Sequence, residues 1–180
     1  MATDDDRFFS LLVGRLGARR AELTERILAE VRAHPGLQTP RQLDRPQLRD
    51  HLPALLERLG AYLQGKPPEE ACPPAVALAD EHGHQRWEQR YRLEELVREL
   101  GVAERVLLRE VLDPAVAGGE APGPEAASLG RERIGRFFED VVAASAERFA
   151  RDAGRSVEDA HQRLRETSAS RLALLQAVTH

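Results

Sequence analysis

The sequence predicts an all-α protein, and three observations lead to this fold class. Apolar residues recur three or four positions apart over long stretches, which is the periodicity of an amphipathic helix. No stretch alternates between apolar and polar residues, and no Asn-Gly or Asp-Gly pair marks a hairpin. Aromatic residues make up only 4% of the chain, so its core must consist mainly of Leu, Ala and Val. We expect a bundle of about five helices followed by a coiled-coil helix.

The amino-terminal part of the chain contains two helical patterns. Apolar residues at spacings of four, with one gap of seven, predict a long helix over residues 7–33. This helix is expected to end before Pro35, because proline disfavours helical geometry in the preceding residue. A second helix is predicted over residues 44–65, with Asp44 as its N-cap and a kink at Pro53.

The middle of the chain predicts a linker and a pair of helices. Residues 66–74 contain four prolines and are expected to be a linker. Residues 75–112 are almost continuously compatible with helix, with a weak point at Gly83 and a predicted break at residues 91–93. Residues 114–124 are rich in glycine and proline and predict a flexible connection.

The carboxyl-terminal part predicts two further helices. The first covers residues 125–153 and is expected to end at Gly154, and Ser156 is the expected N-cap of the last one. We therefore divide the chain into a helical domain, residues 1–154, and a linker helix, residues 155–180.

The last helix also shows the spacing of a coiled-coil seam. Seven positions, some apolar and some polar, follow one another at alternating intervals of four and three residues. Such a seam would pair two chains in parallel into a homodimer. An ordinary amphipathic helix docked on its own bundle would show nearly the same pattern. The seam positions are Val157, His161, Leu164, Ser168, Arg171, Leu175 and Val178.

Composition excludes several classes of protein. A net charge of -4 argues against a nucleic-acid partner, and no apolar run approaches the length needed to cross a membrane. The single cysteine, Cys72, excludes an internal disulfide and any metal site with two thiolates, and it fits a reducing, cytoplasmic location. An incidental thiol is the favoured interpretation of Cys72, with a thioether-linked chromophore as the alternative. No nucleotide-binding, hydrolase or zinc motif is present, so we expect no catalysis from this chain as it stands.

The densest group of polar residues lies at residues 80–87. His82 and Arg86 are four positions apart and share one helix face, which could hold a ligand. The favoured alternative is a structural histidine in the core, hydrogen-bonded to a neighbour, with His84 in solvent. A haem with His82 as its axial ligand is a further alternative, although no second feature supports it. We expect no bound metal and no cofactor.

The chain contains three short motifs, Leu52-Pro53-x-Leu55-Leu56, His82-Gly83-x-x-Arg86 and Tyr91-x-Leu93-x-x-Leu96-x-x-Glu99. Together they resemble the RsbRD-type sensory domain of stressosome co-antagonists, which also forms the amino-terminal input region of bacterial sensor histidine kinases. The resemblance covers roughly residues 8–149 and implies a globin-like helical bundle that often lacks haem. Family members usually have a glycine just before the motif's tyrosine, where this chain has Arg90. With these motifs in view, the sensory or ligand-binding candidates are His82, Arg86, Trp87, Tyr91 and Glu99.

The end of the chain resembles the start of the phosphoacceptor box of sensor histidine kinases. Residues 174–180 form a Leu-rich segment that runs into Val-Thr-His, and the resemblance implies that His180 attacks the γ-phosphate of ATP. A short apolar helix that ends in histidine by chance is the alternative. The resemblances imply the sensory domain of a cytoplasmic two-component kinase that acts with a kinase catalytic domain and a response regulator. Alternatives are a stressosome-like interaction scaffold and a haem or bilin sensor.

Overall fold

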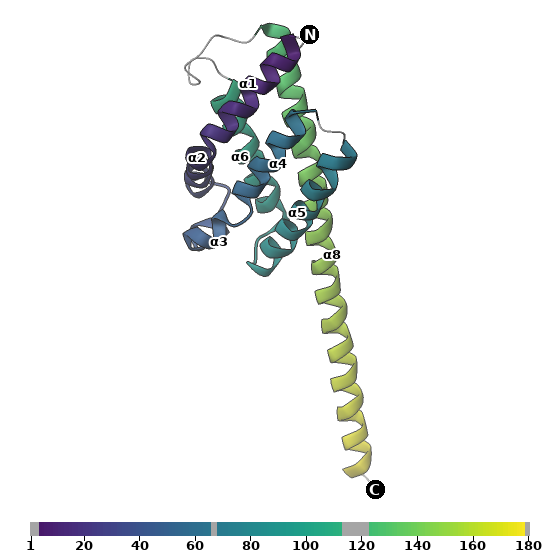
Figure 1. The fold of residues 1–180 in the computed structure, drawn as a ribbon. Coiled ribbons are helices and arrows are strands. Elements are labelled where there is room, and N and C mark those ends of the chain that lie inside the picture. The colour runs from purple at the N-terminus through teal and green to yellow at the C-terminus, as the bar shows by residue number, and fades with distance from the viewer. Residues whose placement is uncertain (1–3, 66–67, 113–122, 179–180) are drawn as a thin grey trace.

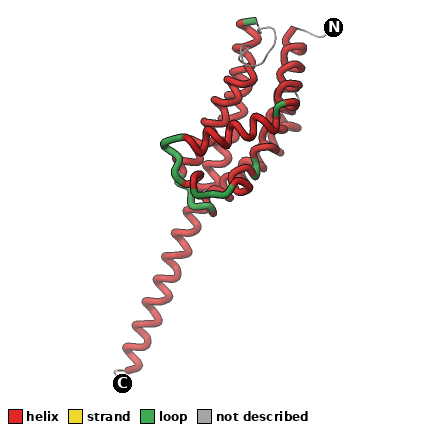
Figure 2. The backbone as a smooth tube through the Cα atoms, turned by 90° about the vertical axis from the view of Figure 1, so that its left-hand side faces the viewer, coloured by secondary structure: helices red, strands yellow, loops and turns green. Residues whose placement is uncertain are grey.

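The computed structural model describes residues 4–65, 68–112 and 123–178, with side chains from residues 6–65, 75–112 and 123–167. These residues form helices and connecting loops without any strand, so the predicted all-α class is confirmed (Figure 2). No helix in these ranges is both long enough and apolar enough to span a membrane. In chain order the elements are α1 Asp4–Ala18, α2 Arg20–Ala33, the 3-10 helix η1 Thr39–Arg41, α3 Arg45–Arg49, α4 Leu52–Leu63, α5 Pro68–Glu88, α6 Leu93–Leu112 and α8 Pro124–Val178.

The single helix predicted over residues 7–33 is wrong, because the chain breaks at Arg19 between α1 and α2. Arg19 leaves the helical region with φ -105° and ψ 9°. Its guanidinium donates to the backbone oxygen of Glu110 at 2.9 Å and to the Glu110 carboxylate at 3.1 Å, both on α6. The gap of seven in the apolar pattern falls across this break.

The predicted second helix is in fact two helices, α3 and α4. Asp44 is the N-cap of α3 as expected, since its carboxylate accepts from the Gln47 amide at 2.8 Å in a capping box. Pro53 lies in the first turn of α4, where a backbone N–H group has no acceptor within the helix, so the missing N–H group of proline costs nothing there. Pro53 therefore stands at the start of a helix and does not kink one. The expected stop at Gly65 is confirmed, because this residue has a φ of 73° just after α4.

Helix α5 begins earlier and α8 runs farther than predicted. Most of the predicted linker, residues 68–74, is the first part of α5. Pro68 lies in the first turn of this helix, where proline is tolerated, whereas Pro73 and Pro74 lie in its second turn. The predicted break near residues 91–93 is confirmed between α5 and α6. The predicted stop at Gly154 and N-cap at Ser156 are wrong, since both lie inside α8. One helical glycine costs only about 1 kcal/mol, which does not end a long helix.

Helix α8 belongs to the bundle at one end and projects from it at the other (Figure 1). Its first part packs beside α5 and α6, and Phe137, Phe138 and Phe149 enter the core there. From residue 154 to residue 167 every side chain is exposed. A single helix of 55 residues therefore connects the core to a segment outside the bundle.

The crossing of α5 and α8 explains why residue 83 is a glycine. A Cβ atom on this residue would lie 2.1 Å from the backbone oxygen of Ser145 on α8, far inside van der Waals contact. The Ser145 hydroxyl donates to the backbone oxygen of Ala79 at 2.8 Å, which joins the same two helices. Gly83 is thus required by the close approach of two backbones.

We predict that Gly83→Ala lowers the free energy of unfolding by about 2 kcal/mol or more, because α5 and α8 must separate to admit the methyl group. Gly154→Ala is the matched control, since nothing lies within 4 Å of its Cβ position, and it should raise stability by about 1 kcal/mol. Urea unfolding of both variants measures the difference. Equal effects of the two substitutions would contradict the close crossing.

Candidate functional site

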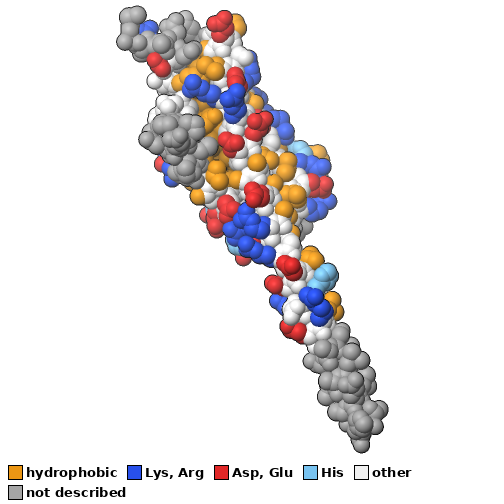
Figure 3. Space-filling model, turned by 90° about the vertical axis from the view of Figure 1, so that its right-hand side faces the viewer, with side chains coloured by type: hydrophobic (Ala, Val, Ile, Leu, Met, Phe, Trp, Pro, Cys, Tyr) orange, Lys and Arg blue, Asp and Glu red, His pale blue; other side chains and the backbone are white. Residues whose placement is uncertain are grey.

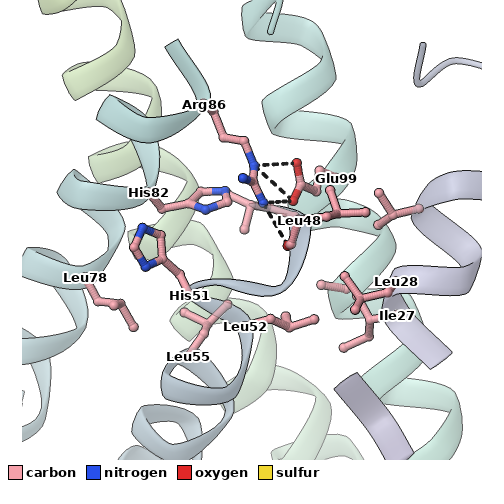
Figure 4. A pocket seen from close by; sticks show the side chains of 13 residues that line it. Ile27, Leu28, Leu48, His51, Leu52, Leu55, Leu78, His82, Arg86 and Glu99 are labelled. Carbon is pink, nitrogen blue, oxygen red and sulfur yellow. Dashed lines mark hydrogen bonds and ion pairs between the residues drawn. The ribbon is translucent and has the colours of Figure 1, made fainter. Parts of the chain in front are cut away.

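Arg86 lies at the centre of the candidate site. Its side chain is almost fully buried, at 1% exposure, between α3, α5 and α6 (Figure 4). Its Nε and Nη2 atoms donate to the carboxylate of Glu99, and the shortest of these bonds is 2.7 Å. Nη2 also donates to the backbone oxygen of Leu48 at 3.2 Å, and Nη1 donates to Gln47 O at 3.2 Å and Gln89 Oε1 at 2.7 Å. All five N–H groups of the guanidinium therefore have acceptors.

The environment of Arg86 keeps it charged and fixed. Burial opposes the positive charge, but the adjacent Glu99 carboxylate outweighs it, so the pKa of the guanidinium is raised above its ordinary value. The backbone oxygens that it binds belong to α3, a helix too short to satisfy its own final carbonyl groups. Arg86 thus joins α3, α5 and α6, and it has no free donor for a ligand.

The end of α5 determines the position of the Tyr91 side chain. The Tyr91 amide donates to Arg86 O and the Arg90 amide to Trp87 O, both at 3.0 Å, which is a Schellman motif. This motif places Arg90 in the left-handed region, with a φ of 64°. The Tyr91 ring is then held 5.1 Å from the Arg86 guanidinium. Burial raises the pKa of the Tyr91 hydroxyl, and the charge of Glu99 adds to the effect.

His82 and His51 have unused hydrogen-bonding capacity, as does the buried Tyr91 hydroxyl. His82 is 7% exposed, and its ring lies 5.9 Å from that of His51 between centroids. The Nε2 atoms of both residues are buried without a hydrogen-bond partner. Burial lowers the pKa of both imidazoles, and the positive charge of Arg86 lowers them further, that of His82 to well below its ordinary value. Both rings are therefore neutral at pH 7. The sequence analysis missed His51, although it directly precedes the Leu52-Pro53 motif.

A small pocket adjoins the two histidines. It has a volume of about 30 Å³ and lies among α2, α3, α4, α5 and α6. A cavity needs roughly 10 to 15 Å³ on the same measure to hold one water molecule. A haem does not fit at His82 in this arrangement, because the pocket is far smaller than a porphyrin and the paired side chains of Arg86 and Glu99 line it (Figure 4).

Trp87 is separated from the other candidates and faces the point where α8 leaves the bundle. Its ring stacks on His84, with centroids 6.3 Å apart. His84 was expected to be solvated, but it is half-buried, and its Nδ1 lies 2.8 Å from the Asp152 carboxylate of α8. Arg148 donates to the same carboxylate at 2.8 Å. Burial alone would raise the pKa of Asp152, but these bonds from Arg148 and His84 hold it below its ordinary value.

The remaining candidates lie outside the described side chains. These are Cys72, His180 and the seam positions from Ser168 to Val178. Val157 and Leu164 are described, and both are exposed, at 57% and 64%. Within the part of the chain that the structure describes, no three His, Cys, Asp or Glu side chains form a group that could hold a metal.

We predict that Arg86→Met lowers the free energy of unfolding by about 3 to 5 kcal/mol, because it leaves the Glu99 carboxylate buried without a partner. The double variant Arg86→Met, Glu99→Leu should recover part of this loss, and a double-mutant cycle in urea measures the coupling. Arg136→Met is the control, since Arg136 pairs with Glu132 on the exposed surface, and it should cost less than about 1 kcal/mol. Purely additive losses would contradict the buried pair.

We also predict that Arg90→Gly raises the free energy of unfolding by about 1 kcal/mol, because glycine adopts a positive φ without steric cost. Gly65→Ala is the reciprocal control at a φ of 73° and should destabilise the protein. Thermal unfolding followed by circular dichroism measures both. A loss of stability in Arg90→Gly would show that the arginine side chain outweighs the strain of its backbone.

Comparisons with known proteins identify the family. No curated protein and no solved structure matches the chain. The globin-like likeness that the resemblance implied therefore stays a prediction. The sequence profile described as the RsbT co-antagonist protein rsbRD N-terminal domain matches residues 21–173, which includes all three motifs and the exposed residues 154–167 of α8. The chain therefore belongs to the RsbRD N-terminal domain family.

Proposed function

We propose that this chain is the amino-terminal sensory domain of a cytoplasmic two-component sensor histidine kinase and that it passes its signal through α8. The observation that carries the proposal is the continuity of α8 from the buried core to the exposed segment beyond residue 154. The family match supports a regulatory domain. The resemblance of residues 174–180 to a phosphoacceptor box supports the kinase.

Helix α5 connects the pocket to α8. His82 and Arg86 line the pocket, whereas Gly83 and His84 contact Ser145 and Asp152 of α8. A change of packing around the pocket therefore moves the same helix against which α8 is held. Because a helix rises about 1.5 Å per residue, the segment after residue 154 carries that movement several nanometres without a joint.

The proposed partner of the exposed segment is a second copy of this chain. Val157 and Leu164 are seven positions apart, which places them on one face of α8, and their apolar side chains lie open to solvent. Figure 3 shows hydrophobic side chains on the surface of the part of α8 that projects from the bundle. Polar residues between them, such as His161, keep such a coiled coil near a balance between two packings. In this proposal the chain has no catalytic activity or cofactor of its own. A kinase domain of the parent protein phosphorylates His180, and a response regulator then accepts the phosphoryl group.

We predict that the chain is a dimer in size-exclusion chromatography with light scattering and that Val157→Glu, Leu164→Glu makes it a monomer, because like charges then face each other across the seam. Val97→Glu is the control, since Val97 is 41% exposed on α6, outside the seam, and it should leave the dimer intact. Far-ultraviolet circular dichroism verifies the fold of each variant.

The seam substitutions, together with His180→Gln, test the kinase assignment in the full-length protein. ATP should label the wild type and not His180→Gln, and the seam variant should lose most of the label if dimerisation is required. A full-length protein that is never labelled would contradict the kinase proposal.

The second candidate function is a stressosome-type interaction scaffold, and the family description favours it because RsbT co-antagonists belong to that assembly. In that case no kinase domain follows the chain. A monomeric chain together with an unlabelled full-length protein would favour the scaffold over the kinase.

A further inference from the structure

We propose that the pocket beside His51 and His82 binds a small neutral molecule that carries one hydroxyl group on an apolar body, of the short-chain alcohol class. The proposal would give the sensory domain proposed above a ligand. Its evidence comes from the residues of the pocket alone, and its test needs no kinase. The ligand proposal and the kinase proposal can therefore fail separately.

The unpartnered imidazole nitrogens are the first evidence for a ligand. His82 is more than nine-tenths buried, and its Nε2 atom has no hydrogen-bond partner, nor does the Nε2 atom of His51. Buried polar atoms without partners are rare in native proteins, because such atoms have lost their hydrogen bonds with water and gained none. Both residues line the pocket, and Figure 4 shows their rings next to each other at its edge. The site is therefore incomplete as a hydrogen-bonding arrangement.

The chemistry of two neutral imidazoles selects a hydroxyl group. A neutral imidazole nitrogen either donates or accepts one hydrogen bond, depending on the tautomer. A hydroxyl group donates one bond and accepts another, so a single hydroxyl can satisfy both Nε2 atoms at once. The other walls are mostly aliphatic, with Ile27, Leu52, Leu55 and Leu78 among them (Figure 4). They suit an apolar body attached to the hydroxyl group.

The charges around the pocket exclude ionic ligands. Every N–H group of Arg86 already has an acceptor, so no free cationic donor remains for an anion. Glu99 is paired with Arg86, so it offers no free carboxylate for a cation. Asp50 and Glu81 act on His51 only through space, and burial still keeps the pKa of that imidazole below its ordinary value. A neutral ligand is the class that remains.

The volume of the pocket sets the size of the ligand. About 30 Å³ corresponds to roughly two or three water positions, which fits a molecule of a few non-hydrogen atoms. Such a small molecule has limited affinity, so binding is expected in the millimolar to high micromolar range. Propan-2-ol is a suitable probe, because it combines one hydroxyl group with two methyl groups.

The test is a titration of the ¹⁵N-labelled 180-residue chain with propan-2-ol, followed by the ring ¹⁵N signals of its histidines. The signals of His51 and His82 should shift and saturate together, because both Nε2 atoms gain a partner. The signal of His161, which is exposed on α8, should change only linearly with the alcohol concentration. Linear changes at all three histidines would overturn the proposal and would leave the pocket to water alone.

Two variants locate the binding. Ala103→Val adds two methyl groups to a buried wall of the pocket without touching the imidazoles, and His51→Phe removes one Nε2 atom at the less buried side. Each should weaken binding by about tenfold or more, whereas His161→Gln should leave it unchanged. Circular dichroism verifies each fold, and His51→Phe decides the result if Ala103→Val does not fold. Saturation that survives in the folded variants would overturn the proposal, because the alcohol would then bind elsewhere.

Discussion

The buried ion pair of Arg86 and Glu99 is the interaction on which the arrangement of the bundle depends. A charge in the core is tolerated only where hydrogen bonds replace the lost water, and Arg86 has such a bond at every N–H group. Its acceptors come from α3, from the end of α5 and from α6. The pair therefore fixes the positions of three helices relative to one another, and both of its residues line the pocket beside His82.

A second constraint acts where α5 crosses α8. Gly83 allows the two backbones to touch, and the pairing of His84 with Asp152 holds α8 again about two turns farther along that helix. Both contacts lie close in sequence to His82 and Arg86, so the residues that line the pocket and those that hold α8 belong to the same short stretch of one helix. The proposed transmission of a signal through α8 requires such an arrangement, in which a local change of packing moves a long helix. It also explains why a glycine and two polar residues stand together in the motif.

The candidate residues divide into three groups with different physical roles. Arg86, Tyr91 and Glu99 form a structural cluster, because the charges of Arg86 and Glu99 pair with each other and the end of α5 is capped within the protein, and only the buried Tyr91 hydroxyl in this cluster has no hydrogen-bond partner. His82, joined by His51, retains unused hydrogen-bonding capacity beside a pocket. Trp87 belongs instead with His84 near Asp152, at the exit of α8. The motif His82-Gly83-x-x-Arg86 thus contains both a structural residue, Arg86, and a residue with an unpartnered polar atom, His82.

The sequence by itself determined the helical class, the capping of α3 by Asp44 and the break after α5, because periodicity, caps and turn residues are local properties of the chain. It also placed His82 and Arg86 on one helix face. Only the tertiary structure decided that Arg19 divides the first helix, since its partner Glu110 is distant in sequence. It likewise decided that His51 joins His82. Such outcomes depend on packing between segments far apart in the chain, where small local preferences are outweighed by buried contacts and hydrogen bonds.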